Sequence, residues 1–345
     1  MKSMSPAQAA RVHPMRGESA PMPDADAGGR RLALFLNSPL PGTKGTMLDT
    51  WKHGIEHAEA SHAAHMRAAI ETFENQAPAK DPAVEAVMLW MLDYWSRRGL
   101  VIKDAQGGGN DRYYPVDAWF VRRWQAAGGI PFALRVLEAF PKLDFGVDTT
   151  PKAHAQFIKP RAGELKWWCL EVGHLGLLHV LRRAIAIAPD YAKGVAEAER
   201  VREQAPLFMR GALAFAFPDE PFCKTDLRFA TPTKKGARVS PEAWGLVTTS
   251  IDADQLAPIL DSMARDSQPF ATDTALYGYT LVKRLGDEAA PHLISYLSIV
   301  KGEYPKEHFG EALALTETPE TAAFFASKAK DKVFGKLAKA YVKNA

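Results

Sequence analysis

The sequence predicts an all-α protein whose C-terminal third is an α-solenoid, a curved right-handed stack of antiparallel helix pairs. Apolar residues recur at helical spacing through most of the chain after residue 46. Beyond residue 241, similar helix–turn–helix patterns return about every 30 to 35 residues, which is the size of one helical repeat. Almost every patterned segment is helical, and the one β element we predict is a small hairpin.

Composition and charge exclude several classes of protein but select no chemistry. The 345 residues are 47% hydrophobic and 24% charged, with a formal net charge of +3. These values exclude collagen-like, disordered and disulfide-scaffold chains, and the length suggests about two domains. With only Cys169 and Cys223, a reducing compartment is the default. No apolar run reaches the roughly 18 residues of a membrane span, and no signal-peptide core opens the chain, so we expect a cytoplasmic protein without membrane contact.

Residues 1–45 are expected to form a flexible N-terminal tail. Prolines and glycines such as Pro6, Pro14 and Gly28 interrupt any helical period there. The apolar run at residues 32–36 is expected to dock on the body of the protein. Six basic residues stand against three acidic ones, a charge too weak for a nucleic-acid arm by itself.

Two helices open the helical body, which spans residues 46–220. The first covers residues 47–74. The second has Asp81 as its N-cap, Pro82 in its first turn and Gly99 as its terminator. Its apolar residues form one stripe at helical spacing: Val84, Val87, Met88, Met91, Leu92 and Trp95. This stripe predicts a helix that is buried against partner helices.

The rest of the body is expected to be helical apart from the hairpin. Gly107, Gly108 and Gly109 turn the chain between extended segments at residues 100–103 and 112–115. Gly128 and Gly129 then separate two helices. The helices predicted for this part of the chain cover residues 116–127, 131–140, 165–187, 191–203 and 207–217.

Residues 221–240 are expected to be a turn-rich basic connector between the body and the repeats. Its basic residues include Lys234, Lys235 and Arg238. The repeats occupy residues 241–345. One unit holds Leu256 and Leu260, and the next has a helix at residues 271–285, a turn at Gly286 and Asp287, and a second helix through residues 290–297.

A third unit runs from residue 305 to residue 315, turns through residues 316–319 and continues past Phe324. The final helix, residues 328–343, combines an apolar stripe with a basic face, as a polar cap on a stack would. The stripe consists of Val333, Phe334, Leu337 and Tyr341.

The C-terminal units resemble HEAT repeats, above all where residues 281–286, Leu-Val-Lys-Arg-Leu-Gly, lead into residues 289–293, Ala-Ala-Pro-His-Leu. Residues 118–134, 210–218 and 324–338 extend the resemblance. Together they are similar to the helical-repeat region of bacterial WGR-domain and molybdenum-metabolism-regulator-like proteins, whose function is largely unknown. The chain departs from that pattern because Leu246, not arginine, follows Trp244 and Gly245, and no WGR module is present. The resemblance implies a HEAT-like α-solenoid and no catalytic residue.

The sharpest local signal for chemistry is a histidine cluster near residue 55. His53, Glu56 and His57 fit the pattern H-x-x-E-H, in which two histidines bind zinc and the glutamate activates water. A third ligand is required, and the all-helical pattern does not match that protease fold. A polar helix face that contacts solvent explains the same residues without a metal. A metal-dependent enzyme that uses His53, Glu56 and His57 is therefore an alternative to the leading interpretation. No other cofactor is predicted.

Basic residues suggest a second alternative. Lys234, Lys235 and Arg238 in the connector, with Lys336 and Lys339 on the final helix, would serve nucleic-acid binding or partner binding along a solenoid face. A solvated cap explains them equally, and the overall charge of +3 favours the cap.

The sequence therefore predicts a non-enzymatic scaffold that binds another protein in the groove of a helical repeat. An inhibitor or immunity-type partner of another bacterial protein is one form of such a module. The absence of a convincing catalytic set favours binding over catalysis.

Overall fold

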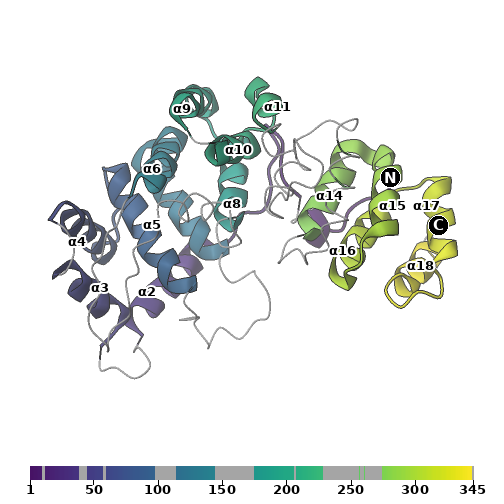
Figure 1. The fold of residues 1–345 in the computed structure, drawn as a ribbon, viewed down its shortest axis with the longest axis horizontal. Coiled ribbons are helices and arrows are strands. Elements are labelled where there is room, and N and C mark those ends of the chain that lie inside the picture. The colour runs from purple at the N-terminus through teal and green to yellow at the C-terminus, as the bar shows by residue number, and fades with distance from the viewer. Residues whose placement is uncertain are drawn as a thin grey trace. The chain divides into compact units, whose positions relative to one another are not determined.

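The computed structural model describes residues 1–9, 12–38, 45–56, 60–97, 114–143, 175–205, 207–227, 256, 260 and 274–343. Within these residues the regular structure is helical and no strand is found, so the all-α prediction is confirmed for them. The chain forms two compact units (Figure 1). The terminal unit combines Met1–Pro21 with Met209–Ala345, and the central unit is Met22–Phe208.

The central unit is built around α6 (Tyr114–Ala139). Four helices pack on it: α2 (Ala25–Asn37), α5 (Pro82–Arg97), α8 (Leu175–Ala186) and α9 (Tyr191–Gln204). α4 (Ala60–Glu74) contacts α5 and also α3 (Met47–Glu56), and η2 (Phe140–Lys142) follows α6.

α2 lies inside the segment for which we predicted a flexible tail. Leu32 and Leu36 are buried, as expected for an apolar run that docks on the body. Gly29 marks a close approach of α2 to α6, because a Cβ atom there would lie 2.7 Å from Cδ1 of Trp119. In a segment where prolines and glycines predicted a break in any helix, this glycine instead lets two helices approach each other.

α5 begins as its sequence predicts. Asp81 Oδ1 accepts a hydrogen bond of 2.9 Å from the Ala83 amide, which caps the first turn. Val84, Val87 and Met88 from the predicted stripe are buried. The side chains of Met91, Leu92 and Trp95 lie outside the described part of the chain.

α6 consists of two helices joined by a kink at the predicted glycine pair. Gly129 has a φ of 72°, in the left-handed region that favours glycine. Beyond it the helix restarts, and Asp190 Oδ2 accepts a hydrogen bond of 2.9 Å from the Ile130 amide. A carboxylate at this helix start satisfies an amide that has no partner within the helix.

The hairpin prediction is wrong where it can be checked. Tyr114 and Pro115, expected in its second strand, form the first turn of α6, a position that proline tolerates well. The rest of the hairpin lies outside the described residues. The predicted helices at residues 191–203 and 207–217 correspond to α9 and α10 (Leu207–Ala216), and α8 covers the end of the helix predicted at residues 165–187. The start of the predicted connector forms the short helix α11 (Pro221–Leu227).

The helices of the terminal unit overlap the segments predicted to be helical, but the final helix, expected from residue 328, begins only at Phe334. These helices are α14 (Thr274–Leu285), η3 (Gly286–Glu288), α15 (Ala289–Ile299), α16 (Glu303–Leu313), α17 (Pro319–Ser327) and α18 (Phe334–Lys343). Alternate helices pack on one another: α14 contacts α16, α15 contacts α17, and α16 contacts α18. Neighbouring helices also pack in the pairs α14–α15, α15–α16 and α17–α18. The helices thus form two rows.

Small residues set the spacing within one row. A Cβ atom at Gly278 would lie 2.9 Å from Cβ of Ala312, and one at Gly310 would lie 2.9 Å from Cδ1 of Leu337. Side chains from all five helices fill a common core, in which Leu293, Tyr296 and Phe309 are fully buried. α18 closes this core with Phe334 and Tyr341. None of the described helices is both long and apolar enough to cross a membrane.

Candidate partner-binding surface

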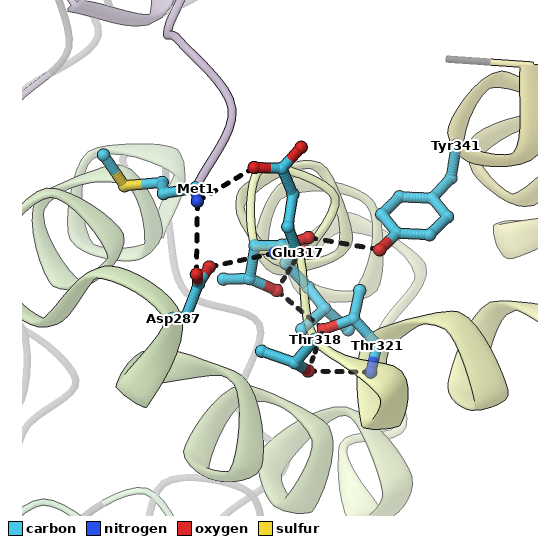
Figure 2. Close-up of polar contacts among 8 residues, drawn as sticks. Met1, Asp287, Glu317, Thr318, Thr321 and Tyr341 are labelled. Atoms are coloured by element: carbon cyan, nitrogen blue, oxygen red, sulfur yellow. Dashed lines mark hydrogen bonds and ion pairs between the residues drawn. The ribbon is translucent and has the colours of Figure 1, made fainter. Parts of the chain in front are cut away.

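Two acidic residues occupy two successive inter-helix turns on the same side of the terminal unit. Asp287 lies in the turn between α14 and α15, and Glu317 lies in the turn between α16 and α17. The Glu317 amide donates a hydrogen bond of 2.9 Å to Asp287 Oδ1 across 30 residues of sequence (Figure 2). This contact between the two turns places two carboxylates side by side at one edge of the terminal unit.

The amino group of Met1 lies between these carboxylates (Figure 2). It is 3.2 Å from Asp287 Oδ2 and 2.9 Å from Glu317 Oε2. Glu317 and then Asp287 raise the pKa of this amine, because both stabilise its protonated form. The Glu317 amide and the Met1 ammonium hold the pKa of Asp287 below its usual range. Two converging carboxylates make this edge selective for a cation.

An aromatic ring extends the cation-binding edge. The Lys2 ammonium lies 4.1 Å from the ring centroid of Tyr341, and the Lys2 amide donates a hydrogen bond of 2.7 Å to the Leu315 carbonyl. The Tyr341 hydroxyl donates to the Thr316 carbonyl at 3.3 Å, which orients the ring. Burial, with the nearby charges of Glu317 and Asp287, raises the pKa of Tyr341.

Buried hydroxyl groups support the turn that carries Glu317. Thr316 Oγ1 donates to the Leu313 carbonyl at 2.8 Å and lies 2.6 Å from Thr321 Oγ1. Thr318 Oγ1 accepts from the Thr321 amide at 3.1 Å and so caps α17. The backbone of this turn is held on both sides, so Glu317 projects from a well-defined position.

The N-terminal segment, defined here as Met1–Glu18, continues from this edge to a buried anchor. Its short helix α1 (Pro6–Ala9) has no buried residue. Val12 and His13 are 4% and 1% exposed, and Val12 joins the core of the terminal unit. The His13 amide donates to Thr280 Oγ1 at 3.0 Å, and the His13 ring meets Phe215 edge-on at 5.1 Å.

Beyond the anchor, Arg16 and Glu18 make further polar contacts. The Arg16 amide donates to Asp219 Oδ2 at 2.8 Å, and Glu18 Oε2 lies 2.7 Å from the Lys283 ammonium. Both side chains of the second pair are more than a third exposed, so the pair adds little stability. Burial of the Val12 side chain contributes more, about 2 kcal/mol. The segment is thus held by polar contacts at both ends and by a buried anchor between them.

The predicted metal residues are only partly within the described chain. His53 Nδ1 lies 3.1 Å from Glu56 Oε2 on α3, and both side chains are at least half exposed. His57 lies outside the described residues, so the complete triad stays a prediction. Among the residues whose positions are described, no three histidine, cysteine, aspartate or glutamate side chains are grouped as a metal site requires.

The structure describes only two of the five basic residues that the sequence singled out. Lys234, Lys235 and Arg238 lie outside the described residues. Lys336 and Lys339 are exposed on α18, on the side away from buried Ala338 and Tyr341. Lys332 in the preceding turn contacts Glu303 at 3.0 Å. The structure does not bring Lys336 or Lys339 together with the edge formed by Asp287 and Glu317.

Sequence reasoning missed the residues that form this edge. Asp287 was noted only as part of a turn, and Tyr341 only as part of an apolar stripe. The signal that points to them is the repeat itself, since Asp287 and Glu317 are 30 residues apart, close to the repeat length.

Comparison of the chain with known protein families, with curated proteins and with solved structures finds no match.

Proposed function

We propose that this chain is a non-enzymatic, HEAT-like helical-repeat module that binds another protein. The observation that carries the proposal is the packing of α14 on α16, of α15 on α17 and of α16 on α18, as stacked helix pairs would pack. Repeats that stack in this way present an extended surface in place of a closed catalytic pocket.

The contacts of the N-terminal segment support the same proposal. Its residues lie on the terminal unit through backbone hydrogen bonds, an apolar anchor and charged ends. These are the kinds of contact by which an extended peptide is recognised. A surface that holds one segment of chain in this way has the chemistry to hold another.

The proposal is tested by capture from the native host with the full chain as bait. The affinity tag is placed after Ala345, because the Met1 amine contacts Asp287 and Glu317. One lysate is treated with nuclease and a second is not, and mass spectrometry identifies the proteins retained. We expect one protein in stoichiometric amount in both lysates. Recovery of no such protein from either lysate would contradict the proposal.

Nucleic-acid binding is the second candidate function, and exposed Lys336 and Lys339 on α18 favour it. It predicts that recovered material disappears with nuclease and that affinity for duplex DNA or RNA falls steeply with salt. The double substitution Lys336→Glu with Lys339→Glu would abolish this binding. Lys301→Glu with Lys330→Glu, an equal change of charge at exposed positions, is the matched control.

A further inference from the structure

We propose that the outer face of α18 binds an acidic, amphipathic helix of a partner protein. This surface, which we call the α18 face, consists of Lys336, Lys339, Ala340 and Val342, all of which are exposed. The inference rests on the proposed protein-binding function and names the kind of partner segment that the terminal unit takes.

The buried side of α18 holds the helix on the terminal unit. Phe334 and Ala338 are 1% and 3% exposed and belong to the common core. Successive residues of a helix are about 100° apart, so side chains at a spacing of three residues form a continuous ridge. Lys336, Lys339 and Val342 form such a ridge on the exposed side. Because the buried side fixes the helix, a partner meets a surface that is already formed.

The chain itself does not neutralise the positive charge of the α18 face. Residues 332–345 contain no aspartate or glutamate. The acid just before them, Asp331, caps the helix, because its Oδ1 accepts hydrogen bonds of 2.8 and 3.2 Å from two backbone amides at the helix start. Within the part of the chain that the structure describes, no carboxylate forms an ion pair with Lys336 or Lys339. The face therefore attracts an anionic partner.

Val342 distinguishes among the kinds of anionic partner. Its side chain is 69% exposed, although valine is one of the residues most often buried in folded proteins. The phosphate backbone of a nucleic acid would neutralise the lysines but would leave this apolar side chain in water. A helix that lies on a membrane inserts its apolar face, and α18 buries that face in the protein core. A protein segment offers carboxylates and apolar side chains next to one another, so it complements the whole ridge.

The spacing of the ridge predicts the form of the partner segment. Side chains three residues apart on a helix lie about 5–6 Å from one another. Two helices pack closely when the ridge of one enters a groove of the other, and the small residue Ala340 lies beside this ridge. The partner helix therefore carries two acids about one turn apart, opposite Lys336 and Lys339, and an apolar residue about one turn further on, opposite Val342.

Site-specific photo-crosslinking in the full chain tests the inference. Ala340 is replaced by the photoreactive residue p-benzoylphenylalanine, and the affinity tag follows Ala345 through a glycine–serine linker of about 20 residues, which keeps the tag away from α18. The chain is expressed in the native host, the cells are irradiated, and mass spectrometry identifies the crosslinked material. The same replacement at Ala192, an exposed position of α9, is the control. We expect position 340 to crosslink to one protein segment that has acidic and apolar residues at helical spacing and that position 192 does not reach.

A synthetic peptide of the crosslinked segment then measures what each contact contributes. Its affinity for the full chain is determined by fluorescence anisotropy. Lys336→Glu with Lys339→Glu is expected to weaken binding at least about tenfold, because acids would then face acids. Val342→Ser should weaken binding about fivefold, because serine removes the apolar contact. Lys80→Glu with Lys193→Glu, an equal change of charge at exposed positions of the central unit, is the control and should leave the affinity unchanged.

The outcomes separate this inference from the proposed function. Capture of a stoichiometric protein that does not crosslink at position 340 overturns the inference and leaves the proposed function standing. Crosslinking of position 340 to nucleic acid, to lipid or to a segment without acids also overturns the inference. A peptide affinity that the double lysine substitution lowers and Val342→Ser leaves unchanged overturns the assignment to an amphipathic helix. Capture of no protein contradicts the proposed function and the inference together.

Discussion

Nη2 of Arg123 donates a hydrogen bond of 2.8 Å to Oε1 of Glu85, and both side chains are buried in the central unit. The same carboxylate accepts from the Ala79 amide at 2.8 Å and from Trp124 Nε1 at 3.1 Å. The Arg123 guanidinium lies 4.4 Å from the ring centroid of Trp119. The pair joins α5 to α6 and to the loop before α5, so it fixes the position of three elements at once.

Removal of one partner of this pair should be more damaging than removal of both. Arg123→Met leaves the Glu85 carboxylate buried without its counter-ion, and we expect the free energy of unfolding to fall by about 3–5 kcal/mol. The double substitution Glu85→Met with Arg123→Met should cost less than the sum of the two single substitutions. Urea unfolding followed by tryptophan fluorescence measures all four chains. Additive losses would show that the pair is not coupled.

Gly129→Ala should destabilise the central unit through a defined collision. The new Cβ atom would lie 2.1 Å from Asp190 Oδ2, and the φ of 72° is strained for alanine. We expect a loss of about 2–3 kcal/mol from the left-handed backbone and the broken hydrogen bond to the Ile130 amide.

The matched variants for this glycine are Gly211→Ala and Asp190→Ala. A Cβ atom at Gly211, inside α10, would meet nothing within 4 Å, so that substitution should be neutral or stabilising. With Asp190 already replaced by alanine, Gly129→Ala should cost only its backbone strain. An unchanged cost in that background would mean that the collision is not its cause.

The stability of the central unit should fall in mild acid because of His179. Burial, followed by the charges of Arg183 and Arg182, holds the pKa of this imidazole well below its usual value of 6.5. The unfolded chain takes up a proton below about pH 6.5 while the folded chain does not. The contribution of neutral His179 is therefore complete above that pH and is lost as the pH falls toward the folded-state pKa, with a slope of up to about 1.4 kcal/mol per pH unit.

Thermal unfolding between pH 8 and pH 5 measures this dependence. His179→Leu should flatten the curve over this interval, because the titrating group is gone. Leu178→Ala, a neighbouring buried position, should lower stability at every pH and keep the slope of the unaltered chain. Equal slopes for the His179→Leu chain and the unaltered chain would disprove the assignment.

Thr318 should contribute to the terminal unit mainly through its hydroxyl group. Thr318→Ala removes the N-cap of α17 and is expected to cost about 1 kcal/mol. Thr318→Ser keeps the oxygen that accepts from the Thr321 amide and should retain most of that stability. Chemical unfolding monitored by circular dichroism compares the two. A similar loss in both variants would point to packing of the methyl group in place of capping.

Local features of the helices were predictable because their causes lie close together in sequence. The cap at Asp81, the break at Gly129 and the turn at Gly286 each depend on residues within one or two helical turns. The segments predicted at residues 271–285, 290–297 and 305–315 differ from α14, α15 and α16 by only a few residues at each end, for the same reason. The polar and charged residues of these helices and turns carried no information about which residues, far away in sequence, they would contact.

The sequence by itself determined that the described chain is helical and where its C-terminal helices turn, since periodic apolar residues and turn residues act locally. Only the tertiary structure decided that Met1 lies between Asp287 and Glu317 and that Glu85 pairs with Arg123. Gly29 illustrates the difference between local and tertiary causes, because its role depends on close packing against Trp119, which is far away in sequence. Such contacts form between elements that are far apart in sequence, so they leave no periodic signal along the chain.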